Sequence, residues 1–246
     1  TAKITPEEQE GIPHYLIDVR EVSEAYSAFD FVKEAETAIK TIVAKGKIPI
    51  IVGGTGLYIQ SLLEGYHLGG SASREDILAY RSELDTLTDE ELFSKIAKLG
   101  LTIPQMNRRR AMRTLEIAHL GKELENKQSD YDALLICLDD AREVLYERIN
   151  QRMEVMLHSG LLQEIEQLLP YRDLNALQTV GYRELFDFWE GKHSLLLAIE
   201  EIKKNTRRFA KRQYTWFNRD ERIQWFDYQT PIEEIIKKTI YNGKNI

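Results

Sequence analysis

The segment KIPIIVGGTGLYIQSLL, residues 47–63, decides the fold of this 246-residue chain. Its residues 48–52 are apolar apart from one proline and predict a buried strand, and a helical pattern starts at Leu57. The letters GGTG at 53–56 join the two, which makes half of a parallel βαβ unit. Backbone amides and a hydroxyl at a helix N-terminus suit an anion. Glycines in such a turn are equally explained by a backbone that needs positive φ.

Two neighbouring stretches extend this interpretation. HYLIDV at residues 14–19 predicts a short strand, and residues 29–45 predict an amphipathic helix ended by Gly46. ALLICLD at residues 133–139 predicts another buried strand. Because strands and helices alternate, the sequence favours an α/β fold with an open, doubly wound parallel sheet. Ligands of such sheets bind at the carboxyl ends of the strands, where the GGTG turn stands.

The pattern changes between residues 69 and 130, where helices are predicted without an intervening strand signal. A run of helices between two strands of an α/β core is most simply an inserted all-helical domain. The helices expected there cover residues 71–85, 88–98 and 107–120, and those expected after Asp140 cover 141–158, 161–169 and 181–189. The predicted domains are a first core part at 1–67, a helical insertion at 68–130, and a second core part with C-terminal helices at 131–246.

Composition narrows the function classes. The chain has 33 basic and 40 acidic residues, for a net charge of −7, which by itself argues against nucleic-acid binding. The single Cys137 excludes an internal disulfide framework and a zinc site of paired cysteines, and its simplest role is that of a small core residue. The five histidines have no metal-ligand spacing. The sequence has no membrane-spanning run and no signal-peptide pattern, so we expect a cytoplasmic protein without membrane contact.

The acidic average hides a basic stretch, EIKKNTRRFAKRQYTWFNRDER at residues 201–222. It holds eight basic and three acidic residues, a charge of +5, so the rest of the chain carries −12. On a helix its cations, Arg208 and Arg212 among them, share one face, while Phe209, Gln213 and Trp216 fall on another. A solvated helix face is one interpretation, and contact with a polyanion is the other.

Two further groups of arginines support the polyanion interpretation. In NRRRAMR at residues 107–113, Arg109 and Arg113 share a helical face. In LYERINQRMEV at residues 145–155, Arg148 and Arg152 lie one turn apart and could bind a diphosphate. The glutamates beside them allow a salt-bridged surface as the alternative.

A phosphate-handling α/β core normally has G-x-x-x-x-G-K-S/T after its first strand, and this sequence has none. We therefore expect an upstream strand, loop and helix ahead of Thr1.

Six segments together are similar to a known family. They are TAKITPEEQEGIPHYLIDV (1–19), IPIIVGGTGLYIQSLLEGY (48–66), NRRRAMRTLEI (107–117), LYERINQRMEVMLHSGLLQEI (145–165), LQTVGYRELFDFWEG (177–191) and NTRRFAKRQYTWF (205–217). In this order they resemble the bacterial tRNA dimethylallyltransferases, or IPP transferases, over nearly the whole chain. The resemblance implies a P-loop NTPase-like core with a helical insertion that grips the anticodon stem-loop. It also implies transfer of dimethylallyl from dimethylallyl diphosphate to N6 of the adenosine 3′-adjacent to the anticodon.

The resemblance carries over to particular residues. The family's G-G-T turn matches Gly53, Gly54 and Thr55, which implies that this turn binds the diphosphate or the target nucleotide. Thr55 and Arg152 are the expected catalytic residues, Thr55 at the reaction channel and Arg152 against the leaving diphosphate. The residues expected to contact tRNA are Arg109, Arg110, Arg113, Gln178, Gly181, Tyr182, Arg183 and, from the basic stretch, Arg208 and Arg212. Many relatives have arginine where Gln178 stands.

The resemblance further implies Mg²⁺ as the cofactor that assists departure of the diphosphate. The family's P-loop, its Mg²⁺-binding residues and its D-S-x-Q segment with the proposed catalytic aspartate lie before the TAK segment, so no metal ligand is expected within this sequence. The expected partners are the tRNA anticodon stem-loop and dimethylallyl diphosphate, and the expected oligomeric state is a monomer. Two alternatives stay open: a nucleotide kinase or NTPase of the same fold, and a non-catalytic RNA-binding fragment.

Overall fold

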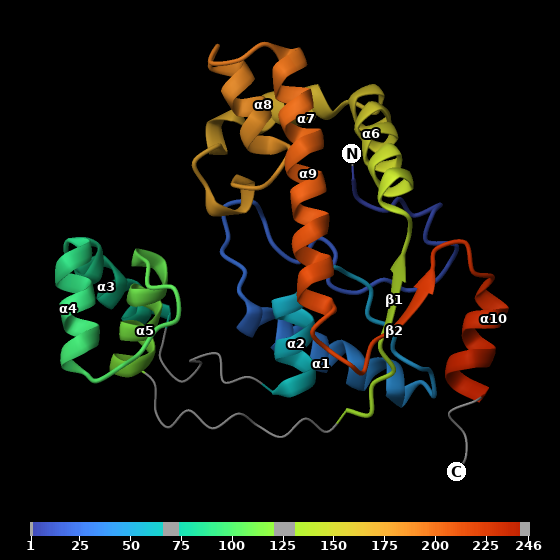
Figure 1. Ribbon diagram of the computed structural model, residues 1–246, viewed down its shortest axis with the longest axis horizontal. Helices are drawn as coiled ribbons and strands as arrows, with labels where there is room; N and C mark the ends of the chain where they lie inside the picture. The colour runs from blue at the N-terminus through green and yellow to red at the C-terminus, as the bar shows by residue number, and fades with distance from the viewer. Residues whose placement is uncertain (1, 66–73, 121–130, 242–246) are drawn as a thin grey trace. The chain divides into compact units, whose positions relative to one another are not determined.

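Figure 1 shows the computed structural model of the chain, which describes residues 2–65, 74–120 and 131–241. The chain forms two compact units. One combines residues 1–59 with 131–246, and the other spans residues 60–130. No helix in the described ranges is long and apolar enough to cross a membrane.

The sheet of the first unit pairs two strands that are far apart in the sequence. Strand β1 (Ile136–Asp139) lies parallel to strand β2 (Gln224–Asp227), with Ile136 opposite Gln224 and Asp139 opposite Asp227. The parallel pairing confirms the α/β class, and β1 lies within the strand expected at residues 133–139. Strand β2 was not predicted, since the chain after Asp140 was expected to be helical. A parallel pair needs a long crossover, and here the helices between the two strands provide it.

The strands expected at residues 14–19 and 48–52 are wrong. Both stretches lack regular secondary structure, and Ile48 and Val52 are 83% and 91% exposed. A strand persists only where a neighbour pairs with its backbone N–H and C=O groups. Neither stretch has a partner strand within residues 2–65, 74–120 and 131–241. An apolar run alone therefore did not suffice to make a strand.

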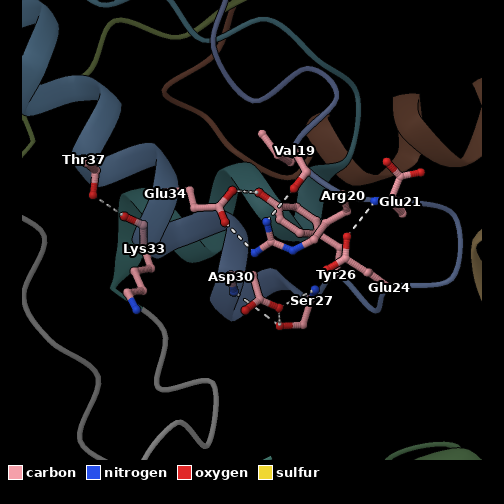
Figure 2. A network of polar contacts seen from close by, with 10 residues as sticks. All are labelled: Val19, Arg20, Glu21, Glu24, Tyr26, Ser27, Asp30, Lys33, Glu34 and Thr37. Atoms are coloured by element: carbon pink, nitrogen blue, oxygen red, sulfur yellow. Dashed lines mark hydrogen bonds and ion pairs between the residues drawn. The ribbon is translucent and has the colours of Figure 1, made fainter.

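Instead of a strand, the segment before helix α1 (Ala28–Ala44) is attached by side chains, as Figure 2 shows. Arg20 Nη2 donates to Glu34 Oε1 at 2.6 Å, and the Tyr26 hydroxyl donates to Glu34 Oε2 at 3.1 Å. The Arg20 guanidinium also lies 5.3 Å from the centre of the Tyr26 ring. Burial and the Glu34 carboxylate both raise the pKa of Tyr26 above its usual value. One carboxylate on α1 thus anchors two residues of this segment.

Helix α1 has a capped start, which was not predicted, and ends at the glycine expected from the sequence. Ser27 caps it and forms a reciprocal pair with Asp30, in which each side chain accepts from the other residue's backbone N–H. At the other end Gly46 has φ +66° and its N–H donates to the Val43 carbonyl at 2.8 Å. The next helix, α2 (Gly56–Glu64), starts at the last glycine of GGTG and contains Tyr58, whose ring stacks 4.9 Å from that of Phe31.

The unit at residues 60–130 is built on three described helices, α3 (Arg74–Asp85), α4 (Asp89–Lys98) and α5 (Arg108–Leu120). Their bounds agree with expectation, although the expected first residues 71–73 lie outside the described residues. Thr88 caps α4 with a reciprocal bond to Glu91. The buried core of this unit consists of Leu84, Leu92, Ile96, Ala111 and Leu115.

The C-terminal part is helical, as expected, up to β2. Its elements are α6 (Arg142–His158), α7 (Leu161–Leu168), two short 3₁₀ turns (Leu169–Tyr171 and Asn175–Leu177), α8 (Tyr182–Trp189), α9 (Leu195–Phe217), α10 (Ile232–Ile236) and a π turn (Lys237–Tyr241). Helices α6 to α9 share one apolar core of Met153, Leu161, Ile165, Leu177, Leu185, Phe186, Ala198 and Ile202. This core fixes α9, the helix that carries most of the basic stretch.

Candidate functional site

Thr55 stands at the start of α2. Its carbonyl accepts from the Tyr58 N–H at 2.9 Å and from the Ile59 N–H at 3.3 Å, so it opens the helix while its side chain is exposed. The N-terminus of a helix presents backbone N–H groups and the positive end of the helix dipole. The hydroxyl of Thr55 is therefore displayed beside a feature that favours an anion.

Close packing explains two of the glycines in this turn, Gly54 and Gly56. Gln213 of α9 donates its Nε2 to the Gly54 carbonyl at 2.9 Å. A Cβ placed on Gly54 would lie 1.8 Å from that Nε2, and one on Gly56 would lie 2.3 Å from Trp216 Cδ1. The alternative interpretation, that this turn needs positive φ, is wrong, because none of its three glycines has it. At Gly56 the neighbour is the Trp216 ring, whereas at Gly54 it is the amide at the end of the flexible Gln213 side chain.

Next to this contact, α9 borders an open groove of about 520 Å³. The residues that line it are Arg208, Lys211, Arg212, Thr215, Trp216 and Arg219. The Trp216 side chain is 40% exposed, so one aromatic ring is available among four cations. The structure thus brings Arg208 and Arg212, which the sequence predicted, to the same helix that packs against the Thr55 turn. The cations suit the phosphates of a nucleic-acid backbone, and the exposed aromatic ring beside them suits stacking on an unpaired base.

The other cations of α9 have partners within the protein. Lys203 forms ion pairs with Glu154 at 3.1 Å and with Glu200 at 3.3 Å, and Lys204 pairs with Glu201 at 2.8 Å. Hydrogen bonds to these carboxylates raise the pKa of Lys203 above its usual value. Helix α9 is therefore divided: its first half is tied to acidic groups, and its second half presents cations to the groove.

Arg152 is exposed on α6 and forms no hydrogen bond or ion pair with any residue that the structure describes. No such bond joins it to the glycine turn. Its neighbour Arg148 is engaged, since its guanidinium lies 3.7 Å from the centre of the Tyr228 ring and 3.9 Å from Asp140 Oδ2. Of the two arginines weighed for diphosphate binding, Arg152 is thus the available one.

The loop at residues 178–183 is fastened to α9 by a buried carboxylate. Gly181 has φ +101°, and its N–H donates to Glu184 Oε2 at 2.8 Å. Asn205 of α9 donates its Nδ2 to the other oxygen of Glu184, also at 2.8 Å. Glu184 is 7% exposed, so this link is protected from water. It places the loop on the helix that borders the groove.

The side chains of this loop differ in their availability. Gln178 donates its Nε2 to the Arg172 carbonyl at 2.8 Å. The Tyr182 hydroxyl donates to Glu164, and burial together with that carboxylate raises the pKa of Tyr182. Arg183 is half-exposed and lies 3.7 Å from Glu184. Among these residues, Arg183 has the weakest internal contact.

The arginines of α5 are held in different ways. Arg109 is exposed and has no hydrogen bond or ion pair within the described ranges. Arg110 donates to the Pro104 carbonyl at 2.6 Å. Arg113 donates to Glu116 Oε2 at 3.1 Å, and Arg81 of α3 forms two bonds with the same carboxylate at 2.6 and 2.9 Å. Of the three predicted arginines, Arg109 is the most available.

Glu116, which sequence reasoning missed, is 1% exposed. Burial by itself raises the pKa of Glu116, but the hydrogen bonds and charges of Arg81 and Arg113 outweigh burial and hold that pKa below its usual value. Gln213 and Trp216 were also missed as contacts of the turn. Their signal was available, because both lie on a helical stripe beside the cations, with a spacing of i, i+3.

Comparison with known proteins gives a consistent result. The family model described as IPP transferase matches residues 1–220. A tRNA dimethylallyltransferase of Streptococcus sanguinis is 60% identical over 243 residues, which are 96% of this chain and 83% of the relative. One of Streptococcus pneumoniae is 55% identical over 227 residues, 92% of this chain and 77% of the relative.

Solved structures give the same result. A tRNA isopentenylpyrophosphate transferase of Staphylococcus epidermidis superposes with a TM-score of 0.70 at 36% identity, over 100% of this chain and 84% of that one. A eukaryotic dimethylallyltransferase acting on tRNA superposes with a TM-score of 0.76 at 27% identity, over 98% of this chain and 66% of that one.

Proposed function

The chain belongs to the IPP transferase family, and from that premise we propose that it transfers a dimethylallyl group from dimethylallyl diphosphate to N6 of the adenosine 3′-adjacent to the anticodon of tRNA. The activity class, prenyl transfer to tRNA, follows from the family and from relatives of 55–60% identity. The donor, the acceptor nitrogen and the residue roles are the proposal, and the site chemistry supports them.

The observation that carries the proposal is the groove of α9 beside the Thr55 turn. Its cations, including Lys211, Arg212 and Arg219, can hold the phosphates of an RNA strand in place. Trp216 can stack on an unpaired base, which favours a single-stranded loop over a duplex. Because Trp216 also packs against Gly56, the RNA groove and the anion-favouring turn share one wall. An acceptor and a diphosphate donor can therefore meet there.

The reaction places its main demand on the leaving group. N6 of adenine forms a bond to the allylic carbon, the bond from that carbon to the diphosphate oxygen breaks, and N6 releases a proton. Negative charge grows on the diphosphate as its bond lengthens, so groups fixed beside that charge accelerate transfer most. The Thr55 hydroxyl, the amides at the start of α2 and the Arg152 guanidinium are the groups we assign to this task.

Mg²⁺ is part of the proposal as a companion of the diphosphate. The described residues contain no group of three side chains suited to hold a metal ion. Mg²⁺ is commonly held by substrate phosphates and water with few protein ligands. When bound, Mg²⁺ would neutralise negative charge on the departing diphosphate.

The adenosine has to leave its stack before its N6 can reach the allylic carbon. Unstacking costs a few kcal/mol, and least for a base that is already unpaired. An anticodon loop supplies such a base, whereas a duplex does not. Phosphate contacts along α9 can offset this free-energy cost by holding the loop while its base is turned outward.

The test is transfer of labelled dimethylallyl from its diphosphate to an anticodon stem-loop that carries adenosine or guanosine at the target position. We expect transfer to adenosine alone, because guanosine has no N6 amine. Equal labelling of both stem-loops would overturn the assignment of the acceptor nitrogen. Tight stem-loop binding without transfer would leave an RNA-binding protein, and hydrolysis of a nucleoside triphosphate without RNA would favour the NTPase alternative.

A further inference from the structure

Thr55 lies between two glycines in the sequence, and each glycine packs against one side chain of α9. Gly54 lies before it and accepts a hydrogen bond from Gln213 Nε2 at 2.9 Å. Gly56 lies after it and faces the Trp216 ring, which a Cβ at Gly56 would approach to 2.3 Å. The conformation of Thr55 is therefore constrained from both sides by one helix.

Gln213 and Trp216 lie three residues apart and thus on the same face of α9. The residues between and beside them line the groove, among them Arg212 and Thr215. One rigid helix therefore holds the turn with one side and presents the groove with the adjoining side. The position of Thr55 relative to the groove cations therefore depends on the contacts between α9 and the turn.

We propose that Gln213 is a positioning residue for transfer: its amide holds the Gly54 carbonyl so that the Thr55 hydroxyl and the first amides of α2 meet the diphosphate. This inference rests on the function proposed above. Gly54 is half-buried, and its carbonyl accepts from a protein donor, a bond that would leave a partly buried acceptor unpaired if it were lost. The amide Nε2 of Gln213 is such a donor. It extends from α9 into the space that a Cβ on Gly54 would occupy.

The first test replaces Gln213 with Ala and with Glu. Glutamate has nearly the same shape, but its carboxylate accepts only and cannot donate to the Gly54 carbonyl. We expect both variants to lower kcat by about 10-fold or more, because small displacements of a reacting group are costly. The KM for each substrate and the affinity for the stem-loop should stay within about 2-fold. Gln167→Ala, an exposed glutamine on α7, is the matched control and should match the parent chain.

The second test is a double-mutant cycle with Gly54→Ala. The new methyl group would displace the Gln213 amide, which is the end of a flexible side chain, so the turn itself can keep its fold. Gly54→Ala alone should lower kcat like Gln213→Ala. The double variant should be no worse than Gln213→Ala, since the bond is already lost.

Several outcomes would overturn the positioning role. They are full activity of Gln213→Glu, losses that multiply in the double variant, or a stem-loop affinity that falls as far as kcat. If Gln213→Ala lowered the melting temperature and its lost activity were restored on cooling, Gln213 would have a structural role instead. Absence of transfer by the parent chain would overturn the proposed function itself, whereas an active parent with an unaffected Gln213→Ala overturns only this inference.

Discussion

Arg152 illustrates how the availability of one guanidinium separates a functional role from a structural one. It is exposed on α6 without an internal partner among the described residues, while Arg148 one turn away is engaged with Tyr228 and Asp140. We expect Arg152→Ala to lower kcat by about 10- to 100-fold, because it removes a charge that stabilises the departing diphosphate. Single-turnover transfer measured with saturating stem-loop is the readout.

The matched control is Arg142→Ala, an exposed arginine at the start of the same helix. It should leave kcat within about 2-fold of the parent chain. Stem-loop affinity should be unchanged in both variants, because the partner of Arg152 is the donor. Equal losses of affinity and of kcat in Arg152→Ala would argue for an RNA contact or a structural role.

Glu116 predicts a pH dependence of stability. Its pKa is held below the usual value in the folded state, so it stabilises the fold above that usual value, and this contribution is lost as the pH falls through the folded-state pKa. Glu116→Gln should lower the free energy of unfolding at neutral pH by about 1 to 3 kcal/mol, because Arg81 and Arg113 lose their charged partner. Urea unfolding followed by circular dichroism at several pH values measures this.

The difference between parent and Glu116→Gln should shrink as the solution is acidified. Glu83→Gln, at an exposed site on α3, should follow the parent chain at every pH. A constant difference down to strongly acidic solution would show that Glu116 does not titrate between its two arginines in the way described.

At the level of single residues, the sequence supplied candidate site residues but did not explain the glycines beside them. Thr55 and the cations Arg208 and Arg212 were expected from patterns, yet the reason for the glycines was not. Whether a glycine serves positive φ or close approach depends on what lies opposite it. Here the opposing residue is Gln213, far away in the sequence, so local reasoning could not decide.

At the level of elements, the division of α9 leads to a prediction about salt. Lys211 and Arg212 line the groove, whereas Lys203 and Lys204 are paired with carboxylates. Lys211→Ala with Arg212→Ala should weaken stem-loop binding and flatten the plot of log affinity against log salt by about 0.7 to 0.9 for each lost phosphate contact. Fluorescence anisotropy over a range of salt concentrations measures both quantities.

The same measurement on Lys203→Ala with Lys204→Ala provides the comparison. Lys203 and Lys204 lie on the same helix as Lys211 and Arg212, and each double variant removes the same charge. A general loss of positive charge would therefore weaken stem-loop binding equally in the two double variants. We expect a smaller change in slope for this pair, because its cations are already neutralised within the protein. Equal slopes for the two double variants would contradict the division of α9.

Helices were predictable because their signals are local. The caps at Ser27 and Thr88 and the end at Gly46 lie within a few residues of the helices they bound. Strands were only partly predictable, because pairing is decided by a partner elsewhere in the chain: β1 was expected, β2 was not, and the strands expected at residues 14–19 and 48–52 are wrong. The apolar residues 48–52 have no such partner in the ranges described, and the short β2 has one in β1.

At the scale of the whole molecule, two separate cores predict two separate stabilities. Ile96 is fully buried in the unit at residues 60–130, and Ile165 is fully buried in the other unit. Ile96→Ala should cost about 2 to 5 kcal/mol, and the loss should be confined to its own unit. Hydrogen exchange followed by mass spectrometry reports the two units separately.

Ile165→Ala is the reciprocal variant. It should increase exchange in helices α6 to α9 and leave α3, α4 and α5 as protected as in the parent chain. If either substitution increased exchange equally in both units, the two cores would unfold as one cooperative body.

The pairing of β1 with β2 sets an order of events on the ribosome. Residues 60–130 emerge before either strand and bury their core through contacts between helices that are close in sequence. Strand β1 emerges next and waits for Gln224, which at ordinary elongation rates takes roughly 5 to 20 s. During that interval Ile136 and Leu138 lack their partner strand, and their unpaired backbone groups are within reach of chaperones and of neighbouring nascent chains. The helical unit is therefore complete early in translation, and the sheet closes last.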